Sequence, residues 1–263
     1  MLLVIDAGNT NLVFALYDGQ KQMGQWRCKT DHQRTADEYF VWLSQLVVLE
    51  GFRTTDITAV AVGSVVPAAN FALRKLSEKF FKTKPVFYGD EDVKVGVEVK
   101  IDRPSEAGAD RVINALEAHK TYGGPLVIVD FGTATTFDVV DDDGAYRGGM
   151  ISPGIAPALE GLYISGARLP NVAISKPEKV IGTNTVGAIQ SGIFWGYIGL
   201  IEGSLRRIEV EAKEQKFFAK KSRMKVIATG GIAPLFDEVT DVFDEVDPDL
   251  TLRGLVRIYT QNS

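Results

Sequence analysis

The stretch Leu126-Val-Ile-Val-Asp-Phe-Gly-Thr-Ala-Thr-Thr136 decides the fold. Its apolar run, rich in β-branched residues, predicts a buried strand, and the strand ends in Asp130, a glycine and three threonines. Glycine lets a backbone approach a ligand closely, amides and hydroxyls donate to phosphate oxygens, and a carboxylate can hold a cation. The pattern indicates either a phosphate site at a strand end or a strand that runs into a β-turn.

The start of the chain repeats this pattern. Met1-Leu-Leu-Val-Ile-Asp-Ala-Gly-Asn-Thr-Asn11 is again an apolar strand followed by an acid, a glycine and side chains with hydroxyl or amide groups. In both copies a second strand and an Asp-Gly turn follow. Gly19 lies 13 residues after Asp6, and Gly144 lies 14 residues after Asp130. The sequence therefore predicts an internally duplicated chain.

The overall charge argues against a nucleic-acid partner. The 263 residues include 29 Lys and Arg against 34 Asp and Glu, which gives a net charge of −5. A DNA or RNA partner requires a basic surface, and this sequence has no long basic run. Small anions remain possible ligands, because local loops rather than net charge bind them. The length and the 45% hydrophobic content suit one large domain or two ordinary ones.

The cysteine and histidine content and the hydropathy of the sequence indicate the compartment and the kinds of site to expect. Cys28 is the single cysteine, so no internal disulfide forms, and this suits a reducing compartment. With His32 and His119 far apart, the sequence also disfavours a zinc site. The N-terminus enters a strand without a leader pattern, and no apolar run approaches the ~18 residues of a membrane span. We therefore expect a cytoplasmic protein without a membrane partner.

Elsewhere the periodicity predicts helices and strands in an α/β order with mixed sheets. A capping box at Thr35 and Glu38 opens the first helix. Gly123-Gly-Pro125 ends a later helix and marks a boundary between two halves, 1–122 and 123–263. The other expected elements are strands over 57–66, 86–88, 93–101 (half-exposed) and 225–228, helices over 68–81, 111–122, 156–168 and 185–212, and a turn-rich connection over 148–155.

A stripe of small residues marks the helix expected over 185–212. Gly192, Gly196, Gly199 and Gly203 recur at helical spacing and so share one face. Two interpretations remain open. The stripe allows close packing of the helix on the sheet, or a flat contact between the helices of two subunits.

None of the glycine-containing strand ends fits the dinucleotide fingerprint or the P-loop. Two duplicated hairpin loops facing each other, with a third glycine loop, instead resemble the nucleotide cleft of the acetate and sugar kinase, Hsc70 and actin superfamily. That superfamily has a duplicated ribonuclease H-like (actin-like ATPase) fold, with two mixed-sheet halves around the cleft. Within it, the chain resembles the type III pantothenate kinases from Met1 to about Tyr259. The motifs that carry the resemblance are Asp6-Ala-Gly-Asn-Thr-Asn11, Gly108-Ala-Asp-Arg111, Asp130-Phe-Gly-Thr-Ala-Thr135, Pro153-Gly154 and Thr229-Gly-Gly231.

The resemblance implies transfer of the ATP γ-phosphoryl group to the primary hydroxyl of pantothenate, the first step of coenzyme A synthesis, in a homodimer. It implies that Asp6 orients the Mg²⁺–phosphate group and that Asp130 binds a monovalent cation, K⁺ or NH₄⁺. It also implies that Asp110 takes the hydroxyl proton. The implied nucleotide-binding residues are Asp6, Ala7, Gly8, Asn9, Thr10, Asn11 and Thr133, and the implied pantothenate-binding residues are Gly108, Ala109, Asp110, Arg111 and Thr185.

Each role has a simpler alternative. Asp110 opens a predicted helix, where aspartates are often N-caps and where the helix dipole lowers a carboxylate pKa and weakens a base. A loose phosphoryl-transfer transition state, however, needs positioning more than strong deprotonation. Arg111 could be a solvated first-turn residue, and Thr185 could be the cap of the long helix.

One position departs from the family pattern. Ile101 stands where the family often has a tyrosine, three residues before the proline of the Pro-x-x-x-Gly-x-Asp-Arg loop, and a lost phenol affects the details of the pantothenate pocket. Two other functions stay open: a regulatory protein like the Bvg accessory factors, and a kinase of another small alcohol. The acidic composition and the presence of Asp6, Asp110 and Asp130 favour catalysis.

Overall fold

The computed structural model describes residues 1–166, 170, 172–219 and 221–263. The chain forms two compact units. The first unit comprises residues 1–97, 103–117 and 250–263, and the second comprises residues 98–102 and 118–249. A single division after residue 122 stays a prediction, and the compact units differ from it because residues 250–263 return to the first unit.

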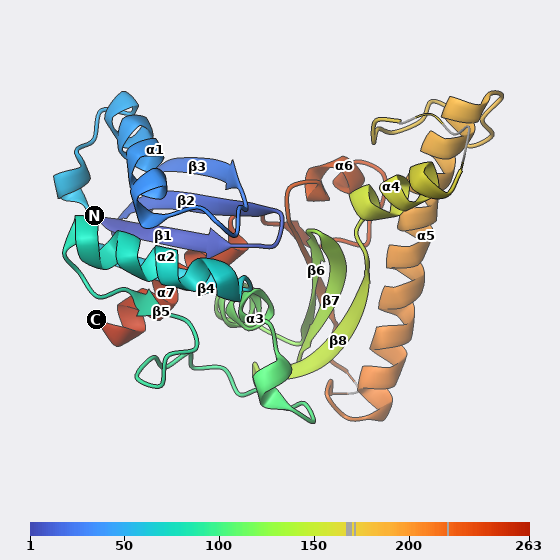
Figure 1. Ribbon diagram of the computed structural model, residues 1–263. Coiled ribbons are helices and arrows are strands. Elements are labelled where there is room, and N and C mark those ends of the chain that lie inside the picture. Colours follow the sequence, from blue (N-terminus) through green and yellow to red (C-terminus); the bar gives the residue numbers. More distant parts are fainter. Residues whose placement is uncertain (167–169, 171, 220) are drawn as a thin grey trace. The chain divides into compact units, whose positions relative to one another are not determined.

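The first unit is built on a five-stranded mixed sheet with the strand order β3-β2-β1-β4-β5 (Figure 1). The strands β1, β2 and β3 are antiparallel neighbours, whereas β4 and β5 run parallel to β1. The carboxyl ends of β1, β4 and β5 therefore meet at one edge of the sheet. The strands are β1 (Leu2–Ala7), β2 (Asn11–Asp18), β3 (Lys21–Lys29), β4 (Ala59–Ser64) and β5 (Val86–Phe87).

Helices cover both faces of this sheet. Side chains alternate along β1, so its successive apolar residues point to opposite faces, and both faces need a cover. Leu3 and Ile5 pack with apolar residues of α1 (Ala36–Leu49) and α2 (Pro67–Leu76), and α2 continues as a π-turn over Ser77–Phe81. The opposite face carries Leu2 and Val4, which pack with α3 (Ala109–Tyr122) and α7 (Leu250–Asn262). Asp6 follows Leu2 and Val4 at the period of two and so faces α3.

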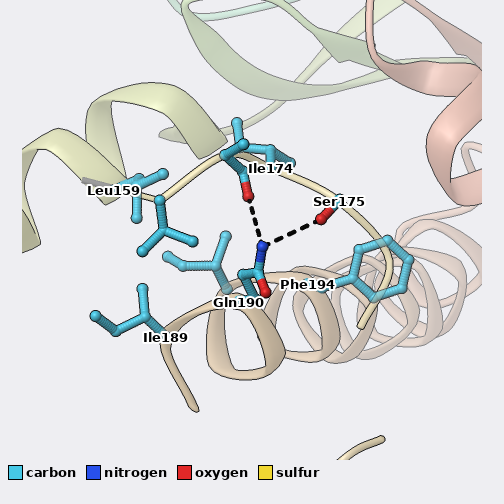
Figure 2. Close-up of a pocket in the computed structure, with 9 residues that line it drawn as sticks. Leu159, Ile174, Ser175, Ile189, Gln190 and Phe194 are labelled. Atoms are coloured by element: carbon cyan, nitrogen blue, oxygen red, sulfur yellow. Dashed lines mark hydrogen bonds between the residues drawn. The ribbon is translucent and has the colours of Figure 1, made fainter. Parts of the chain in front are cut away.

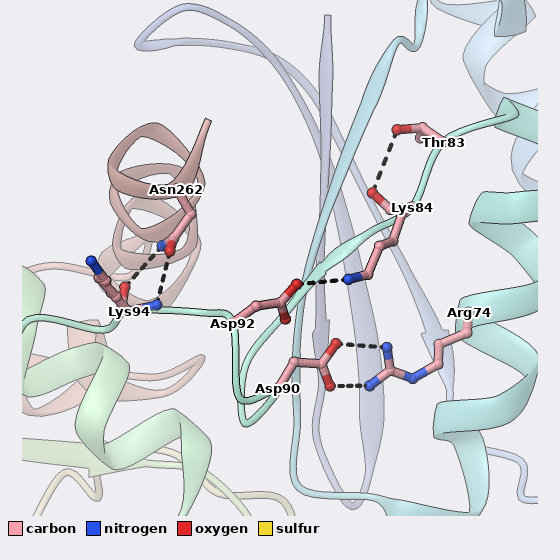
Figure 3. Close-up of polar contacts among 7 residues, drawn as sticks. All are labelled: Arg74, Thr83, Lys84, Asp90, Asp92, Lys94 and Asn262. Carbon is pink, nitrogen blue, oxygen red and sulfur yellow. Dashed lines mark hydrogen bonds and ion pairs between the residues drawn. The ribbon is translucent and has the colours of Figure 1, made fainter.

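The expected strand over 93–101 is absent from the described structure, apart from one bridge between Val99 and Tyr146. In the first unit, the backbone at Lys94 bonds instead to the Asn262 side chain, through Lys94 N to Oδ1 and through Nδ2 to Lys94 O, both at 2.8 Å (Figure 3). The alternating valines do bury one side against the core. The alternating pattern therefore predicted the buried side of this segment correctly. The prediction of a strand was wrong, because among the described residues the segment has no neighbouring strand to pair with beyond the one bridge.

Ion pairs join the segment before this one to the body of the first unit. Arg74 of α2 makes a two-pronged pair with Asp90, at 2.9 and 2.5 Å, and Lys84 pairs with Asp92 at 2.7 Å (Figure 3). The Arg74 guanidinium also lies over the ring of Phe87, 4.0 Å from its centroid. These contacts fix the chain that leaves β5.

The second unit repeats the topology of the first. Its sheet has the order β10-β9-β6-β7-β8, with β6, β7 and β8 antiparallel and with β9 and β10 parallel to β6. Reversing the order gives the arrangement of the first sheet strand for strand, which confirms the predicted duplication. The elements are β6 (Leu126–Phe131), β7 (Ala134–Val140), β8 (Tyr146–Pro153), α4 (Ile155–Ser165), α5 (Thr185–Glu214), β9 (Lys225–Thr229), α6 (Ala233–Asp237) and β10 (Glu245–Val246).

Three expectations for the second unit need correction. The predicted turn-rich connection over 148–155 is mostly the strand β8, because its glycines allow another backbone to come close. The cap of α5 is Asn184, whose Oδ1 accepts from the amide of Gly187 at 2.8 Å, so Thr185 is the first helical residue rather than the cap. The helix predicted over 156–168 ends at Ser165, and residues 167 and 168 lie outside the described residues.

Gly149 shows why β8 contains glycines. A Cβ at this position would overlap the backbone carbonyl of Phe137 on β7, whereas a Cβ at Gly161 of α4 meets nothing within 4 Å. We expect Gly149→Ala to lower the free energy of unfolding by about 3 kcal/mol, because backbone must move. Gly161→Ala is the matched control, and it should be neutral or slightly stabilising. Urea unfolding of both variants measures the difference, and equal stabilities would contradict the prediction.

No helix in the described part of the chain is both long enough and apolar enough to cross a membrane.

Candidate functional site

Asp6 is the next-to-last residue of β1, at the edge of the first sheet where the carboxyl ends of the parallel strands meet. Its neighbours in register are Val13 on β2 and Gly63 on β4. A Cβ at Gly63 would stand 2.8 Å from Ile113 of α3 and 3.1 Å from Leu255 of α7, so the two helices pack tightly there. Asp6 is therefore held under the start of α3.

The environment of Asp6 changes its ionisation. The pKa of Asp6 is raised from 3.8 to about 7, first by burial and then by the negative charge of Asp110, while the charge of Arg27 acts in the opposite direction. The effect of Asp110 places these two carboxyl groups, which were predicted from separate motifs, within electrostatic range of each other in the first unit. A pair of acids of this kind is common where a cation binds or a proton moves.

The loop after Asp6 is a tight turn. The amide of Gly8 donates to the carbonyl of Asn11 at 3.0 Å, so Gly8 shapes the turn and its N–H is already occupied. The exposed side chains of Asn9, Thr10 and Asn11 are the groups that the loop presents outward. Ala7 is fully buried at the end of β1, and its carbonyl accepts the amide of Val65 at 3.0 Å.

Thr30 fixes this loop through two hydrogen bonds, and no sequence motif pointed to it. Its Oγ1 donates to the carbonyl of Gly8 at 2.6 Å, and its amide donates to the carbonyl of Thr10 at 2.9 Å. Both bonds depend on the register between β2 and β3, in which Asn11 pairs with Lys29. A motif search along one strand does not find such a residue.

Asp110 is the second residue of α3, and it is half-buried. The carbonyl of Gly108 accepts the amide of Val112 at 3.2 Å, so the helix begins around Gly108 and Asp110 is not its N-cap. Asp110 Oδ1 accepts from the amide of Arg111 at 2.8 Å. A Cβ at Gly108 would stand 2.7 Å from that same oxygen, so glycine makes room for the carboxylate. Ala109 is buried, and Arg111 is half-buried.

The second unit has an acid, Asp130, at the position of its sheet that corresponds to Asp6 in the first. Asp130 lies near the end of β6, next to Thr136 on β7 and Thr229 on β9. A Cβ at Gly230, which has φ +92°, would stand 2.6 Å from the carbonyl oxygen of Phe131 and 2.8 Å from Asp130 Oδ1. A carboxylate and a carbonyl oxygen therefore line one small space that only glycine leaves open.

This oxygen set suits a hard cation held partly by backbone. Among the described residues, no group of three or more His, Cys, Asp or Glu side chains could hold a metal ion. A cation at Asp130 would therefore need carbonyl oxygens such as that of Phe131, which the turn supplies. At Asp6, one carboxylate is enough for Mg²⁺, because that ion commonly keeps waters and substrate phosphates as its other ligands. The residues present fit both ions.

Thr133 lies in the turn between β6 and β7. Its carbonyl accepts the amide of Gly154 at 3.1 Å, and a Cβ at Gly154 would overlap that carbonyl. Tyr197 of α5 donates from its hydroxyl to the carbonyl of Pro153 at 2.8 Å. The motif Pro153-Gly154 thus supports the turn that carries Thr133.

Thr185 is exposed at the start of α5, in the second unit. Near this end of α5, Gln190 donates from Nε2 to the carbonyl of Ala173 at 3.4 Å and to Ser175 Oγ at 3.3 Å (Figure 2). The enclosed cavity beside Gln190 measures only about 10 Å³, which is room for one water molecule at most. This cavity is therefore packing space and not a substrate pocket.

Known proteins similar to this one match it over its whole length. The sequence profile described as "Type III pantothenate kinase" matches residues 2–207. A type III pantothenate kinase from Paramagnetospirillum magneticum is 56% identical over 263 residues, covering 100% of this chain and 98% of that protein. Another from Rhodospirillum rubrum is 53% identical and covers 100% of this chain and 99% of that protein.

Solved structures agree with the fold. A Campylobacter jejuni protein assigned to the Baf family of transcriptional activators has a TM-score of 0.61 at 20% identity, covering 99% of this chain and 98% of its own. A Listeria monocytogenes protein named as an N-acetylmannosamine kinase has a TM-score of 0.51 at 13% identity, with the same coverage. The fold is thus the duplicated α/β fold of the sugar kinases and actin-like ATPases, as predicted. The full-length identity and the matching profile go further: the chain belongs to the type III pantothenate kinase family.

Proposed function

We infer that the protein phosphorylates pantothenate with ATP, giving 4′-phosphopantothenate in the first step of coenzyme A biosynthesis. The observation that carries this inference beyond family membership is the shared site of Asp6 and Asp110 in the first unit. One acid precedes a turn that presents polar side chains, and the other lies in the first turn of a helix. A kinase of this kind needs one acid for the metal–phosphate group and a second for the acceptor hydroxyl.

Asp6 orients the metal–phosphate group in this proposal. Mg²⁺, when bound with ATP, neutralises the charge that develops on the transferring group. The exposed side chains of Asn9, Thr10 and Asn11 donate to phosphate oxygens, while Gly8 and Ala7 set the shape of the turn. Positioning accounts for most of the catalysis, because the transition state is loose.

Asp110 accepts the proton of the pantothenate hydroxyl. Its carboxylate is fixed by the Arg111 amide and by the space at Gly108, so it has a defined direction. Arg111 and the backbone from Gly108 to Ala109 hold the pantothenate. Since Asp110 is not the helix cap, its side chain is not needed to begin α3, and a functional role explains its position better than a structural one.

The second unit supplies the remaining proposed contacts. Asp130 and the carbonyl of Phe131 bind K⁺ or NH₄⁺, Thr133 contacts the nucleotide, and Thr185 contacts the substrate. The exposure of Thr185 and the availability of its hydroxyl, which is not used as a cap, support the last assignment.

A coupled ADP-release assay tests the function. We expect pantothenate-dependent ADP release with MgATP, faster in KCl or NH₄Cl than in NaCl at equal ionic strength. Reactions without pantothenate are the control for unproductive ATP hydrolysis. No pantothenate-dependent turnover with any monovalent cation would contradict the proposed function. Equal rates in all three salts would contradict the proposed K⁺ or NH₄⁺ site at Asp130.

The other two functions are less well supported. Full-length relatives at 50–56% identity are named as pantothenate kinases, so a purely regulatory role is not favoured. The likeness to the C. jejuni protein concerns the fold alone at 20% identity. Replacing pantothenate by other small alcohols in the same assay tests the third possibility. The cytoplasmic location, the absence of a nucleic-acid partner and the absence of a membrane partner stay predictions.

We also propose a homodimer that forms through α5. Gly192, Gly196 and Gly199 are exposed, and a Cβ at each meets nothing within 4 Å of its own unit. Gly203, the fourth glycine of the stripe, is buried. The three exposed glycines support a flat contact with a second copy. The same unit also exposes apolar side chains: Ile151, Leu162, Tyr163, Ile164, Val180, Ile181 and Val186.

Gly196→Leu tests the dimer. We expect the variant to be monomeric at concentrations where the parent protein is dimeric, because a leucine would separate two closely packed helices. Light scattering measures the mass. Gln45→Leu, an exposed position on α1 of the first unit, is the control for added surface hydrophobicity. An unchanged dimer mass for Gly196→Leu would exclude the stripe as the interface.

A further inference from the structure

A row of residues crosses the first sheet at the level of Asp6. Asp6 pairs with Val13 on β2, and Val13 pairs with Arg27 on β3. Residues that lie opposite each other in neighbouring strands point to the same face of a sheet. Arg27, Val13 and Asp6 therefore all point to the face that carries α3 and Asp110.

Arg27 lies near Asp6 along this row. Neighbouring strands are about 4.8 Å apart, so two strand spacings, about 10 Å, separate the two backbones. The Val13 side chain between them is short and half-buried, and an extended arginine side chain is long enough to cross much of this distance. The charge of Arg27 acts on the pKa of Asp6, after the larger effects of burial and of Asp110, which places the guanidinium within electrostatic range.

Arg27 differs in its surroundings from the arginines that are paired with acids. In the described part of the chain, Arg53, Arg74, Arg103, Arg147, Arg223, Arg253 and Arg257 form ion pairs with acids. Arg27 is exposed, and in that same part of the chain it makes no hydrogen bond or ion pair. A guanidinium with five unused donors thus lies on the same face of the sheet as the acid proposed for the metal–phosphate group, within electrostatic range of it.

The strand that carries Arg27 is fixed to the phosphate loop. Thr30, three residues further along, bonds to the carbonyls of Gly8 and Thr10. On the opposite face of β3, Trp26 is buried in the core with the α1 side of the sheet. The position of Arg27 relative to the loop is therefore set by packing and by backbone bonds, and does not depend on a flexible tether.

We propose that Arg27 binds the γ-phosphoryl group of ATP during its transfer, a role that rests on the proposed kinase function. A planar guanidinium forms two parallel hydrogen bonds to phosphate oxygens, and it keeps its charge at any working pH. Charge develops on the transferring group, so a fixed cation there stabilises the transition state more than the ground state. The lack of a partner in the free protein then has a reason, because the partner is the substrate.

The experiment compares Arg27→Gln and Arg27→Lys with Lys21→Gln. Lys21 is an exposed cation at the far end of the same strand, so its variant controls for the lost charge. Calorimetry in MgCl₂ measures binding of ADP and of a non-hydrolysable ATP analogue. For Arg27→Gln we expect about tenfold weaker binding of the analogue, ADP binding within about twofold, and at least a tenfold lower kcat with pantothenate. Arg27→Lys should recover part of both, because it keeps the charge but not the fork.

The outcomes separate this proposal from the proposed function. Unchanged analogue binding in Arg27→Gln, or an equal loss for ADP and the analogue, overturns the role of Arg27 even where the parent protein turns over pantothenate. A parent protein that does not turn over pantothenate overturns the acceptor assignment, while a selective loss of analogue binding still supports Arg27. A thermal midpoint of Arg27→Gln equal to that of the parent, without nucleotide, excludes a folding defect as the cause.

Discussion

Asp110→Asn is expected to lower kcat by about a hundredfold or more while the protein stays folded. The amide has the shape of the carboxylate and can still accept the hydrogen bond from the Arg111 amide. It cannot take a proton from the pantothenate hydroxyl, and general bases typically contribute a factor of about 10² to 10⁴. The loss should fall on kcat more than on the KM for pantothenate.

The coupled ADP-release assay measures this loss, and circular dichroism confirms that α3 is intact. Asp18→Asn, at an exposed carboxylate before the β2–β3 turn, is the matched control and should keep normal turnover. Near-normal kcat in Asp110→Asn would leave Asp110 with a structural role in the first turn of α3 and would require another base.

Asp6→Asn is expected to lose activity by a similar factor and yet to gain stability above neutral pH. The folded protein holds the Asp6 proton to about pH 7, whereas an unfolded aspartate releases it near pH 3.8. A raised folded pKa contributes stability that is fully present below about pH 3.8 and is lost as the pH rises through about 7. The parent protein therefore loses up to about 1.4 kcal/mol per pH unit across this window through Asp6, and the asparagine variant does not.

Urea unfolding at several pH values, without nucleotide or Mg²⁺, measures the difference between parent and variant. The advantage of Asp6→Asn should grow between about pH 4 and pH 7 and then level off. Asp18→Asn again serves as control, with no such growth. An Asp6→Asn variant that is less stable than the parent at pH 8 would contradict the burial and charge repulsion proposed for this site.

Local patterns predicted much of the fold. The duplicated strand–loop–strand pattern around Asp6 and Asp130 located both hairpins, and the capping box at Thr35 is present with both of its bonds. Patterns failed where tertiary contacts decide the structure. The strand β8 was concealed by Gly148 and Gly149, which read as turn residues. The helix α7 was not predicted, although its buried residues Leu252, Leu255 and Val256 recur at helical spacing.

The candidate site, too, could be predicted only in part from the sequence. The residues at strand ends and at the start of α3 were identified from motifs that run along the chain. Thr30 and Arg27 belong to the site only through the register of β3 against β2, which pairs residues far apart in sequence. Sequence alone gives a strand but not its register, so residues that act across strands stay hidden until the sheet is known.

The return of α7 to the first unit has a consequence for synthesis of the chain. Leu252 and Leu255 complete the core beneath β1 and β4, but the ribosome makes them only after the whole second unit. During translation the β1–β2 loop is therefore present without α7, one of the two helices that cover this face of its sheet. The second unit, once it has emerged, already has all of its strands. We expect the nascent chain to complete its proposed ATP-binding half last, although β1 of that half is made before every strand of the second unit.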